Sequence, residues 1–148
     1  MLILLKIKRI QPLINLKKAR VDAEAATLAQ VRREKIAVVQ AMKDNQRRYM
    51  QGLDELNVIR ESSARINQET VESGLDHVKA SWYKCYKSVQ EIEIKEKRQI
   101  GQLLTAEREL AAVEKLKEKY QLEFRKKSSK SEQRALDEIA LRQFTSRN

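Results

Sequence analysis

Apolar residues recur along this chain at alternating steps of four and three. In the first half the repeat runs through residues 3–70, and most of its positions hold large apolar side chains. In the second half it runs through residues 75–124, where only Glu96, Gln99 and Lys117 are polar. A four-three repeat places its members on one stripe of an α-helix, as in a coiled coil. The sequence therefore predicts an all-α fold in which two long helices pack through these two seams.

Residues that break helices gather between the two seams. Ser73 and Gly74 are the strongest local break, and Asp76 follows Ser73 by three residues as in a capping box. The pair Ser62 and Ser63 is the rival position, so the turn is expected within residues 60–75.

Either turn would fold the chain into an antiparallel two-helix coiled-coil hairpin, a single domain covering residues 1–148. An amphipathic helix needs a partner for its apolar stripe, and the nearest partner is the other half of its own chain. One unbroken helix in a parallel dimer is the alternative. Because proline is accepted in a first helical turn, we expect the ordered helix to begin near Pro12, with residues 1–11 as a flexible or separately bound arm.

Composition agrees with long helices and excludes most enzymes. Ala, Glu, Leu, Lys and Arg make up about half of the chain, with only 3 Gly and 1 Pro. The single histidine, His77, and the single cysteine, Cys85, cannot assemble a catalytic triad, a Cys-His dyad or a zinc cluster within one chain. The glycines are isolated, so no phosphate-binding loop is present. We expect no enzymatic activity, no cofactor, no metal and no small-molecule substrate; His77 is expected on the surface and Cys85 in the seam.

The opening segment is not expected to be a signal or a membrane span. Its apolar run is four residues long and is broken by Lys6 and Lys8, and no stretch approaches 18 consecutive apolar residues. A lone cysteine agrees with a reducing compartment.

Positive charge gathers at both ends of the chain. The net charge is +10; residues 1–20 carry six bases and no acid, and residues 125–148 carry seven bases and three acids. Residues 21–124 are neutral, with exposed pairs such as Glu91 with Lys95 and Glu93 with Lys97 expected one helical turn apart. In an antiparallel hairpin the two basic segments meet, which favours an acidic partner or phosphate groups. The alternative is that the basic ends only keep the protein soluble.

Two short strings resemble a known family. Residues 136–142 read apolar, Asp, Glu, apolar, Ala, any, Arg, and a second string places Val71, Leu75, Val78 and Trp82 at steps of four, three and four. Together with the length and the paired heptads, these strings resemble the stalk proteins of bacterial type III secretion: the FliJ family of flagella and the YscO family of injectisomes. The likeness covers essentially the whole chain. Val71 and Trp82 stand where the flagellar pattern carries Phe and His, and an injectisome, YscO-like member is the expectation.

The resemblance implies a cytoplasmic, non-catalytic stalk at the secretion apparatus. Such a stalk stands in the pore of the hexameric secretion ATPase, promotes ring assembly and hydrolysis, links the ring to the export-gate membrane protein and holds secretion chaperones. The export-gate contacts would be Val71, Leu75, Val78 and Trp82. The ATPase-ring contacts would be the charged residues of both ends: Lys6, Lys8, Arg9, Lys17, Lys18, Arg20, Arg125, Lys126, Lys127, Lys130, Arg134, Asp137, Glu138 and Arg142.

Other functions remain open at this point. A generic structural coiled coil fits the pattern, and so does a nucleic-acid-associated one. The sequence argues against nucleic-acid binding, because Phe124 and Phe144 are the only aromatic residues near the basic segments and offer little for base stacking. A membrane-surface scaffold would use residues 1–20, with Ile3, Ile7, Ile10 and Ile14 as its apolar face.

Overall fold

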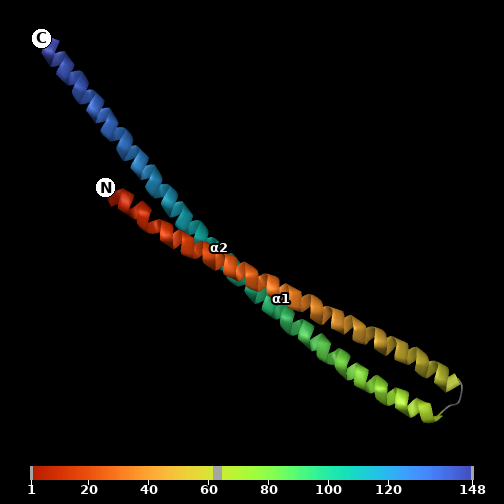
Figure 1. Ribbon diagram of the computed structural model, residues 1–148. Coiled ribbons are helices and arrows are strands. Elements are labelled where there is room, and N and C mark those ends of the chain that lie inside the picture. The colour runs from red at the N-terminus through yellow and green to blue at the C-terminus, as the bar shows by residue number, and fades with distance from the viewer. Residues whose placement is uncertain (1, 62–64, 148) are drawn as a thin grey trace. The chain divides into compact units, whose positions relative to one another are not determined.

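The computed structural model describes residues 2–61 and 65–147, which form two α-helices (Figure 1). Helix α1 spans Leu2–Glu61 and helix α2 spans Arg65–Arg147. No strand occurs in these described ranges. The prediction of an all-α, two-helix fold is confirmed.

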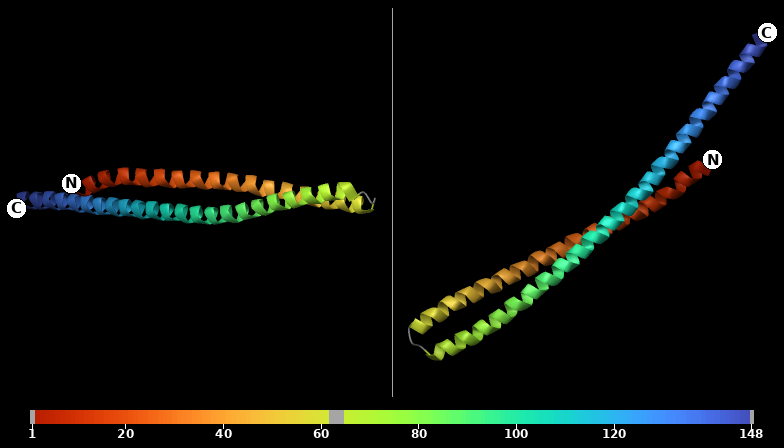
Figure 2. Two further views of the ribbon diagram at one scale, coloured as in Figure 1. Left: turned by 90° about the horizontal axis from the view of Figure 1, so that it is seen from below. Right: turned by 180° about the vertical axis from the view of Figure 1, so that it is seen from behind.

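The chain divides into two compact units, each made of parts of both helices. The hairpin unit is Glu24–Leu103, and the terminal unit combines Met1–Ala23 with Leu104–Asn148. Within the hairpin unit, α1 and α2 lie side by side in opposite directions (Figures 1 and 2). Arg60 pairs with Glu72 near one end of this unit, and Glu24 contacts Gln99 near the other. The chain is therefore an antiparallel hairpin, and the single unbroken helix of the dimer alternative is wrong.

The apolar core coincides with the predicted seams. Every buried apolar side chain of the described residues occupies a position of the four-three repeat: Ile3, Ile10, Ile14, Leu28, Val31, Leu56, Leu75, Val89, Ile92 and Ala106. Most other seam positions are half-buried, among them Trp82 and Phe124. The two helices are thus held together mainly by removal of this stripe from water.

The break predicted at Ser73 and Gly74 is wrong, because both residues lie inside α2. Both are exposed, and a Gly at an exposed helical position costs only about 1 kcal/mol relative to Ala. The next residue, Leu75, is buried in the seam, and such burial contributes about 1.5–3 kcal/mol. Packing therefore overrides the local preference. The rival pair, Ser62 and Ser63, lies outside the described residues.

Helix α1 begins at Leu2, so the prediction that it begins near Pro12 is also wrong. A proline inside a helix removes one backbone hydrogen bond and costs about 3 kcal/mol. Ile3 and Ile10 precede it and are both buried, and together they offset that cost. Residues 2–11 are therefore helical.

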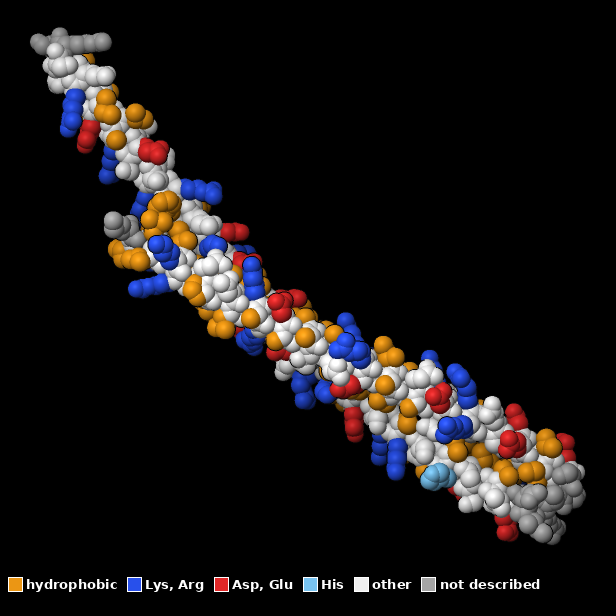
Figure 3. Space-filling view, viewed as in Figure 1, with side chains coloured by type: hydrophobic (Ala, Val, Ile, Leu, Met, Phe, Trp, Pro, Cys, Tyr) orange, Lys and Arg blue, Asp and Glu red, His pale blue; other side chains and the backbone are white. Residues whose placement is uncertain are grey.

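Helix α2 continues far beyond the end of the seam. Past Phe124 the four-three repeat falls on Lys127, Ser131, Arg134 and Glu138, which cannot form an apolar interface. Every described side chain from Arg125 to Ser146 is exposed. This part of α2 is a single helix whose side chains are exposed all round. On the face drawn in Figure 3, basic, acidic and apolar side chains are intermixed.

Candidate partner-binding surfaces

Several cations of the terminal unit hold α1 to α2. The ammonium of Lys17 and the guanidinium of Arg20 approach the same Glu109 carboxylate oxygen at 3.0 and 2.8 Å. The Lys6 ammonium lies over the Tyr120 ring, 5.4 Å from its centre. Three of the six α1 bases predicted to bind an ATPase ring therefore have partners within the protein.

This arrangement lowers the pKa of the Glu109 carboxyl. The hydrogen bond from Lys17 holds the pKa of the Glu109 carboxyl below its ordinary value of 4.5. The nearby positive charge of Arg20 lowers this pKa further, and partial desolvation opposes the shift. Glu109 therefore stays ionised and keeps both cations in place.

The other predicted ring-binding residues are exposed. Lys8, Arg9 and Lys18 lie on α1, and the rest lie on the single-helix part of α2: Arg125, Lys126, Lys127, Lys130, Arg134, Asp137, Glu138 and Arg142. Asp137 accepts a hydrogen bond from Gln133 at 3.2 Å. Both groups belong to the terminal unit, so the structure brings them into one compact unit.

Sequence reasoning missed the apolar side chains of the same segment. Leu136, Ile139, Leu141 and Phe144 are all more than half exposed. The available signal was that the seam becomes polar after Phe124 while large apolar residues continue to occur beyond it. Exposed apolar residues on an unpaired helix are typical of a surface that binds a protein partner.

The four residues predicted to bind the export gate lie in the hairpin unit, on the side of α2 that faces α1. Leu75 is 8% exposed and is packed over Gly52, where an added Cβ would approach Leu75 Cγ to 3.2 Å. Val71, Val78 and Trp82 are half-buried. The Trp82 ring contacts the Tyr49 ring of α1, with centroids 5.6 Å apart. Leu75 is therefore a core residue, whereas the other three retain exposed surface.

An aromatic surface beside Trp82 was not found from the sequence. Lys79, Trp82, Tyr83 and Tyr86 line a shallow cavity of about 270 Å³. Tyr83 and Tyr86 are 59% and 49% exposed. The signal was present, because both tyrosines fall outside the four-three repeat and so could not belong to the core.

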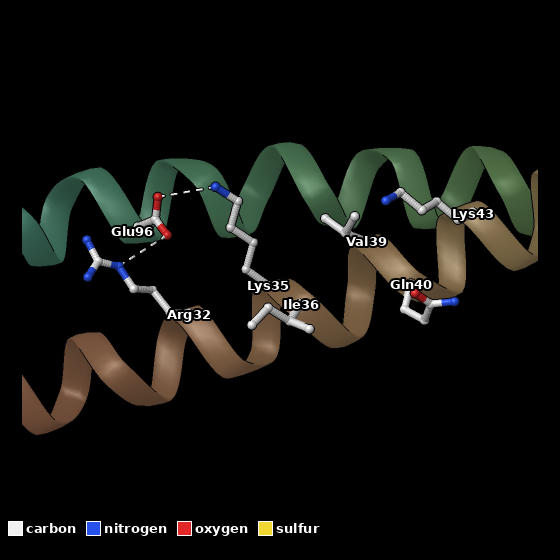
Figure 4. A pocket seen from close by; sticks show the side chains of 7 residues that line it. All are labelled: Arg32, Lys35, Ile36, Val39, Gln40, Lys43 and Glu96. Carbon is white, nitrogen blue, oxygen red and sulfur yellow. Dashed lines mark hydrogen bonds and ion pairs between the residues drawn. The ribbon is translucent and has the colours of Figure 1, made fainter.

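A second groove of the hairpin unit is polar at one end. Arg32 and Lys35 of α1 reach the two carboxylate oxygens of Glu96 of α2, at 3.8 and 3.2 Å (Figure 4). Ile36, Val39, Gln40 and Lys43 line the rest of this groove, whose volume is about 470 Å³. Three bases therefore face one carboxylate, so the charged side chains of the groove are net positive.

The predicted pairs Glu91–Lys95 and Glu93–Lys97 are absent from the ion pairs of the described residues. Lys95 instead approaches Glu34 of α1 at 3.4 Å. The Glu34 carboxylate is within reach of Lys95 because the two helices lie side by side. Spacing along a single helix cannot predict such a contact between helices. Exposed pairs of this kind contribute about 0.2–1 kcal/mol each.

The described part of the chain contains no candidate metal site. It contains no cluster of three or more His, Cys, Asp or Glu side chains able to hold a metal ion. His77 is exposed, as predicted, and Cys85 is a half-buried seam residue whose sulfur accepts a hydrogen bond from Asn45 Nδ2 at 3.3 Å. No helix of the described residues has a stretch long and apolar enough to cross a membrane.

These features define a class: a two-helix hairpin with charged and apolar surfaces suited to protein partners. The family model for the flagellar FliJ protein matches residues 6–148, and the chain belongs to the FliJ family. This is a family of non-catalytic stalk proteins of flagellar and type III export, which confirms the predicted family and its general role. Comparison with curated proteins and with solved structures gave no match. Assignment to the injectisome rather than the flagellar branch stays a prediction.

Proposed function

We propose that this protein is the stalk of a type III secretion ATPase complex. In this role it inserts in the hexameric ATPase ring, promotes ring assembly and hydrolysis, and links the ring to the export-gate membrane protein. It works at the cytoplasmic face of the secretion apparatus and also holds secretion chaperones. Family membership supports the export role in general.

The observation that carries the ring-binding role is the single-helix part of α2. From Arg125 to Ser146 every described side chain is exposed, so this segment is narrow enough to enter a ring without first separating from α1. Arg125, Lys126, Lys127 and Lys130 supply positive charge at its beginning. Leu136, Ile139 and Phe144 supply apolar contacts further along. Charge of this kind speeds association and fixes orientation, and the apolar side chains add affinity.

The export gate is proposed to bind the hairpin unit around Val71, Val78 and Trp82. All three side chains are half-buried, so each can contact a partner without leaving the seam. Leu75 supports this surface from the core. Chaperones, which are themselves helical partners in this proposal, would bind the exposed flanks of the helices.

Charge reversal tests the ring-binding role. Changing Arg125, Lys126, Lys127 and Lys130 to Glu should abolish stimulation of the purified ATPase, because an acidic ring lumen would repel the introduced carboxylates. A matched control reverses four exposed bases elsewhere: Arg47, Lys97, Arg98 and Arg108. Both variants change the net charge by the same amount, and circular dichroism should show that both remain helical.

The two variants separate a specific site from a general charge effect. Loss of stimulation in the terminal variant alone supports the proposal, and added salt should weaken the wild-type association. Equal loss in both variants would show that only net charge matters. Normal stimulation by the terminal variant would reject the ring-binding role, and preferential binding of RNA or DNA would favour the nucleic-acid alternative.

A further inference from the structure

The outward face of α2 between Lys79 and Gln90 has the properties of a binding surface. Each of five residues is three or four positions from another of the set, so they share one face: Lys79, Tyr83, Tyr86, Lys87 and Gln90. Tyr83 and Tyr86 are about half exposed or more, which is unusual for two neighbouring aromatic residues on the outside of a hairpin. None of these five residues belongs to the seam.

This face can accept negative charge. Residues 77–90 contain Lys79, Lys84 and Lys87 but no acid, between Asp76 on one side and Glu91 on the other. Tyrosine hydroxyls add hydrogen-bond donors. The Tyr86 hydroxyl accepts a hydrogen bond from Gln90 Nε2 at 3.1 Å and still has its own proton to donate. Ammonium and phenol groups together are suited to binding carboxylates.

The same face has a place for one apolar side chain. The cavity of about 270 Å³ is lined by Lys79, Trp82, Tyr83 and Tyr86. Its Trp82 wall is held from behind by the Tyr49 ring of α1. Positioned aromatic walls of this kind anchor a protruding aliphatic or aromatic side chain of a partner.

We propose that this face is a docking site for an acidic amphipathic helix of a partner protein. One apolar side chain of that helix enters the cavity beside Trp82, and its carboxylates bind Lys79 and Lys87. The partner helix lies along α2 as a third helix of the hairpin unit, since the recognised residues repeat at helical spacing. This docking site shares Trp82 with the proposed export-gate surface, but it adds a different face of α2 to the proposed function and does not depend on binding of the ATPase.

Two other anionic partners fit the geometry less well. Single-stranded nucleic acid would stack its bases on open aromatic faces, but the Lys87 ammonium lies over the Tyr83 ring at 4.9 Å. A bilayer of anionic lipid would contact the lysines, yet it presents no single side chain to fill the cavity beside Trp82.

The test uses the full chain and Trp82, its only tryptophan, as the reporter. The main probe is a synthetic amphipathic helix of about 20 residues with Glu on its polar face and Leu on its apolar face. Comparison probes are the same peptide with Lys in place of Glu, an oligouridine and phosphatidylglycerol vesicles. The acidic peptide should shift Trp82 emission to shorter wavelength, because the indole loses water when the cavity is filled.

Two double variants identify the face. Tyr83→Ala with Tyr86→Ala removes the cavity wall, and Lys79→Glu with Lys87→Glu reverses the charge; each should weaken peptide binding about tenfold or more. Lys115→Glu with Lys119→Glu, at exposed positions of the terminal unit, is the matched control and should leave binding unchanged.

The proposal has clear ways to fail. It is overturned if the acidic peptide leaves Trp82 emission unchanged, or if the basic peptide, oligouridine or vesicles shift it as strongly. It is also overturned if both face variants bind the acidic peptide as tightly as the wild type. If the Ala variants lose helicity in circular dichroism, Tyr83→Gln with Tyr86→Gln replaces them, because Gln keeps a long side chain suited to a helix.

Discussion

Gln99 of α2 donates its side-chain amide to the backbone carbonyl oxygen of Glu24 in α1 at 3.0 Å, and it also contacts the Glu24 carboxylate. Gln99 is 7% exposed and, among the described residues, is the polar residue buried together with the apolar side chains of the seam. A slip of one heptad would place Gln99 against Lys17 or Val31, which are the neighbouring heptad positions of α1. A buried polar pair whose hydrogen bonds are made in the observed register favours that register over the shifted ones.

This pair predicts opposite effects of single and double substitution. Gln99→Leu removes both hydrogen bonds and leaves the Glu24 carboxylate against an apolar side chain, which should cost about 1–3 kcal/mol of unfolding free energy. Combining it with Glu24→Leu should recover that loss or exceed it, because two apolar residues then face each other. Chemical denaturation measures both effects. A double variant less stable than Gln99→Leu alone would contradict this account of the seam.

The double variant should also lose specificity. With no polar pair to fix the register, it should form a mixture of associated species, which analytical ultracentrifugation would detect beside the wild-type protein. A sharp single species for the double variant would show that register is set elsewhere, for example by the ion pairs of Glu96 with Arg32 and Lys35.

The core was predictable from the sequence because a coiled-coil seam is a local pattern. Each buried apolar residue, from Ile3 to Ala106, could be placed by counting steps of four and three. The turn and the helix start were not predictable in the same way. Gly74 and Pro12 carry strong local preferences, and only the burial of neighbours such as Leu75 and Ile10 overrides them.

Candidate surfaces were harder to predict than the core. The charged ends were visible as runs of Lys and Arg, but the sequence could not show that Lys17 and Arg20 pair with Glu109. Those contacts join residues 92 and 89 positions apart in the chain, so they depend on the register between the two helices. The face of Tyr83 and Tyr86 was not predicted, because both residues lie outside the four-three repeat, which indicates only the core.

The three glycines should respond differently to alanine. A Cβ at Gly52 would meet the Leu75 side chain, whereas a Cβ at Gly74 or Gly101 would meet nothing within 4 Å beyond the neighbouring residues and backbone of its own helix. Gly74→Ala and Gly101→Ala should each stabilise the protein by about 1 kcal/mol through helix propensity. Gly52→Ala gains the same propensity but forces Leu75 to move, so it should be neutral or destabilising by about 1–2 kcal/mol. Thermal unfolding of the three variants checks this, and equal stabilisation at all three sites would refute close packing at Gly52.

The Glu109 cluster predicts a pH dependence. The pKa of the folded-state Glu109 carboxyl is lowered by Lys17 and Arg20, so its ionised form stabilises the fold. This contribution is fully present above the ordinary pKa of 4.5 and is lost as the pH falls through the lowered folded-state pKa. Glu109→Gln should therefore lower the melting temperature at neutral pH and reduce its fall on acidification.

Melting temperatures measured from about pH 7 to about pH 3 test this linkage. Glu107→Gln is the control, since Glu107 is exposed and forms no ion pair in the described part of the chain. If the two variants show the same pH profile, the Lys17–Glu109–Arg20 cluster contributes nothing to stability.

Substitutions of Trp82 can distinguish packing against α1 from binding to the export gate. Its side chain is half-buried and contacts Tyr49, so Trp82→Ala should destabilise the hairpin by about 1–3 kcal/mol, less than the 3–5 kcal/mol expected for a fully buried aromatic residue. Trp82→Phe should keep most of this stability, because a ring still contacts Tyr49.

If the exposed part of Trp82 also binds the export gate, Trp82→Phe should weaken gate binding despite its near-normal melting temperature. Leu75→Ala, which alters only the core, is the comparison: it should lower stability by about 2–5 kcal/mol with little loss of gate affinity below its melting temperature. Normal gate affinity for Trp82→Phe and for Trp82→Ala, measured on folded protein, would restrict Trp82 to a structural role.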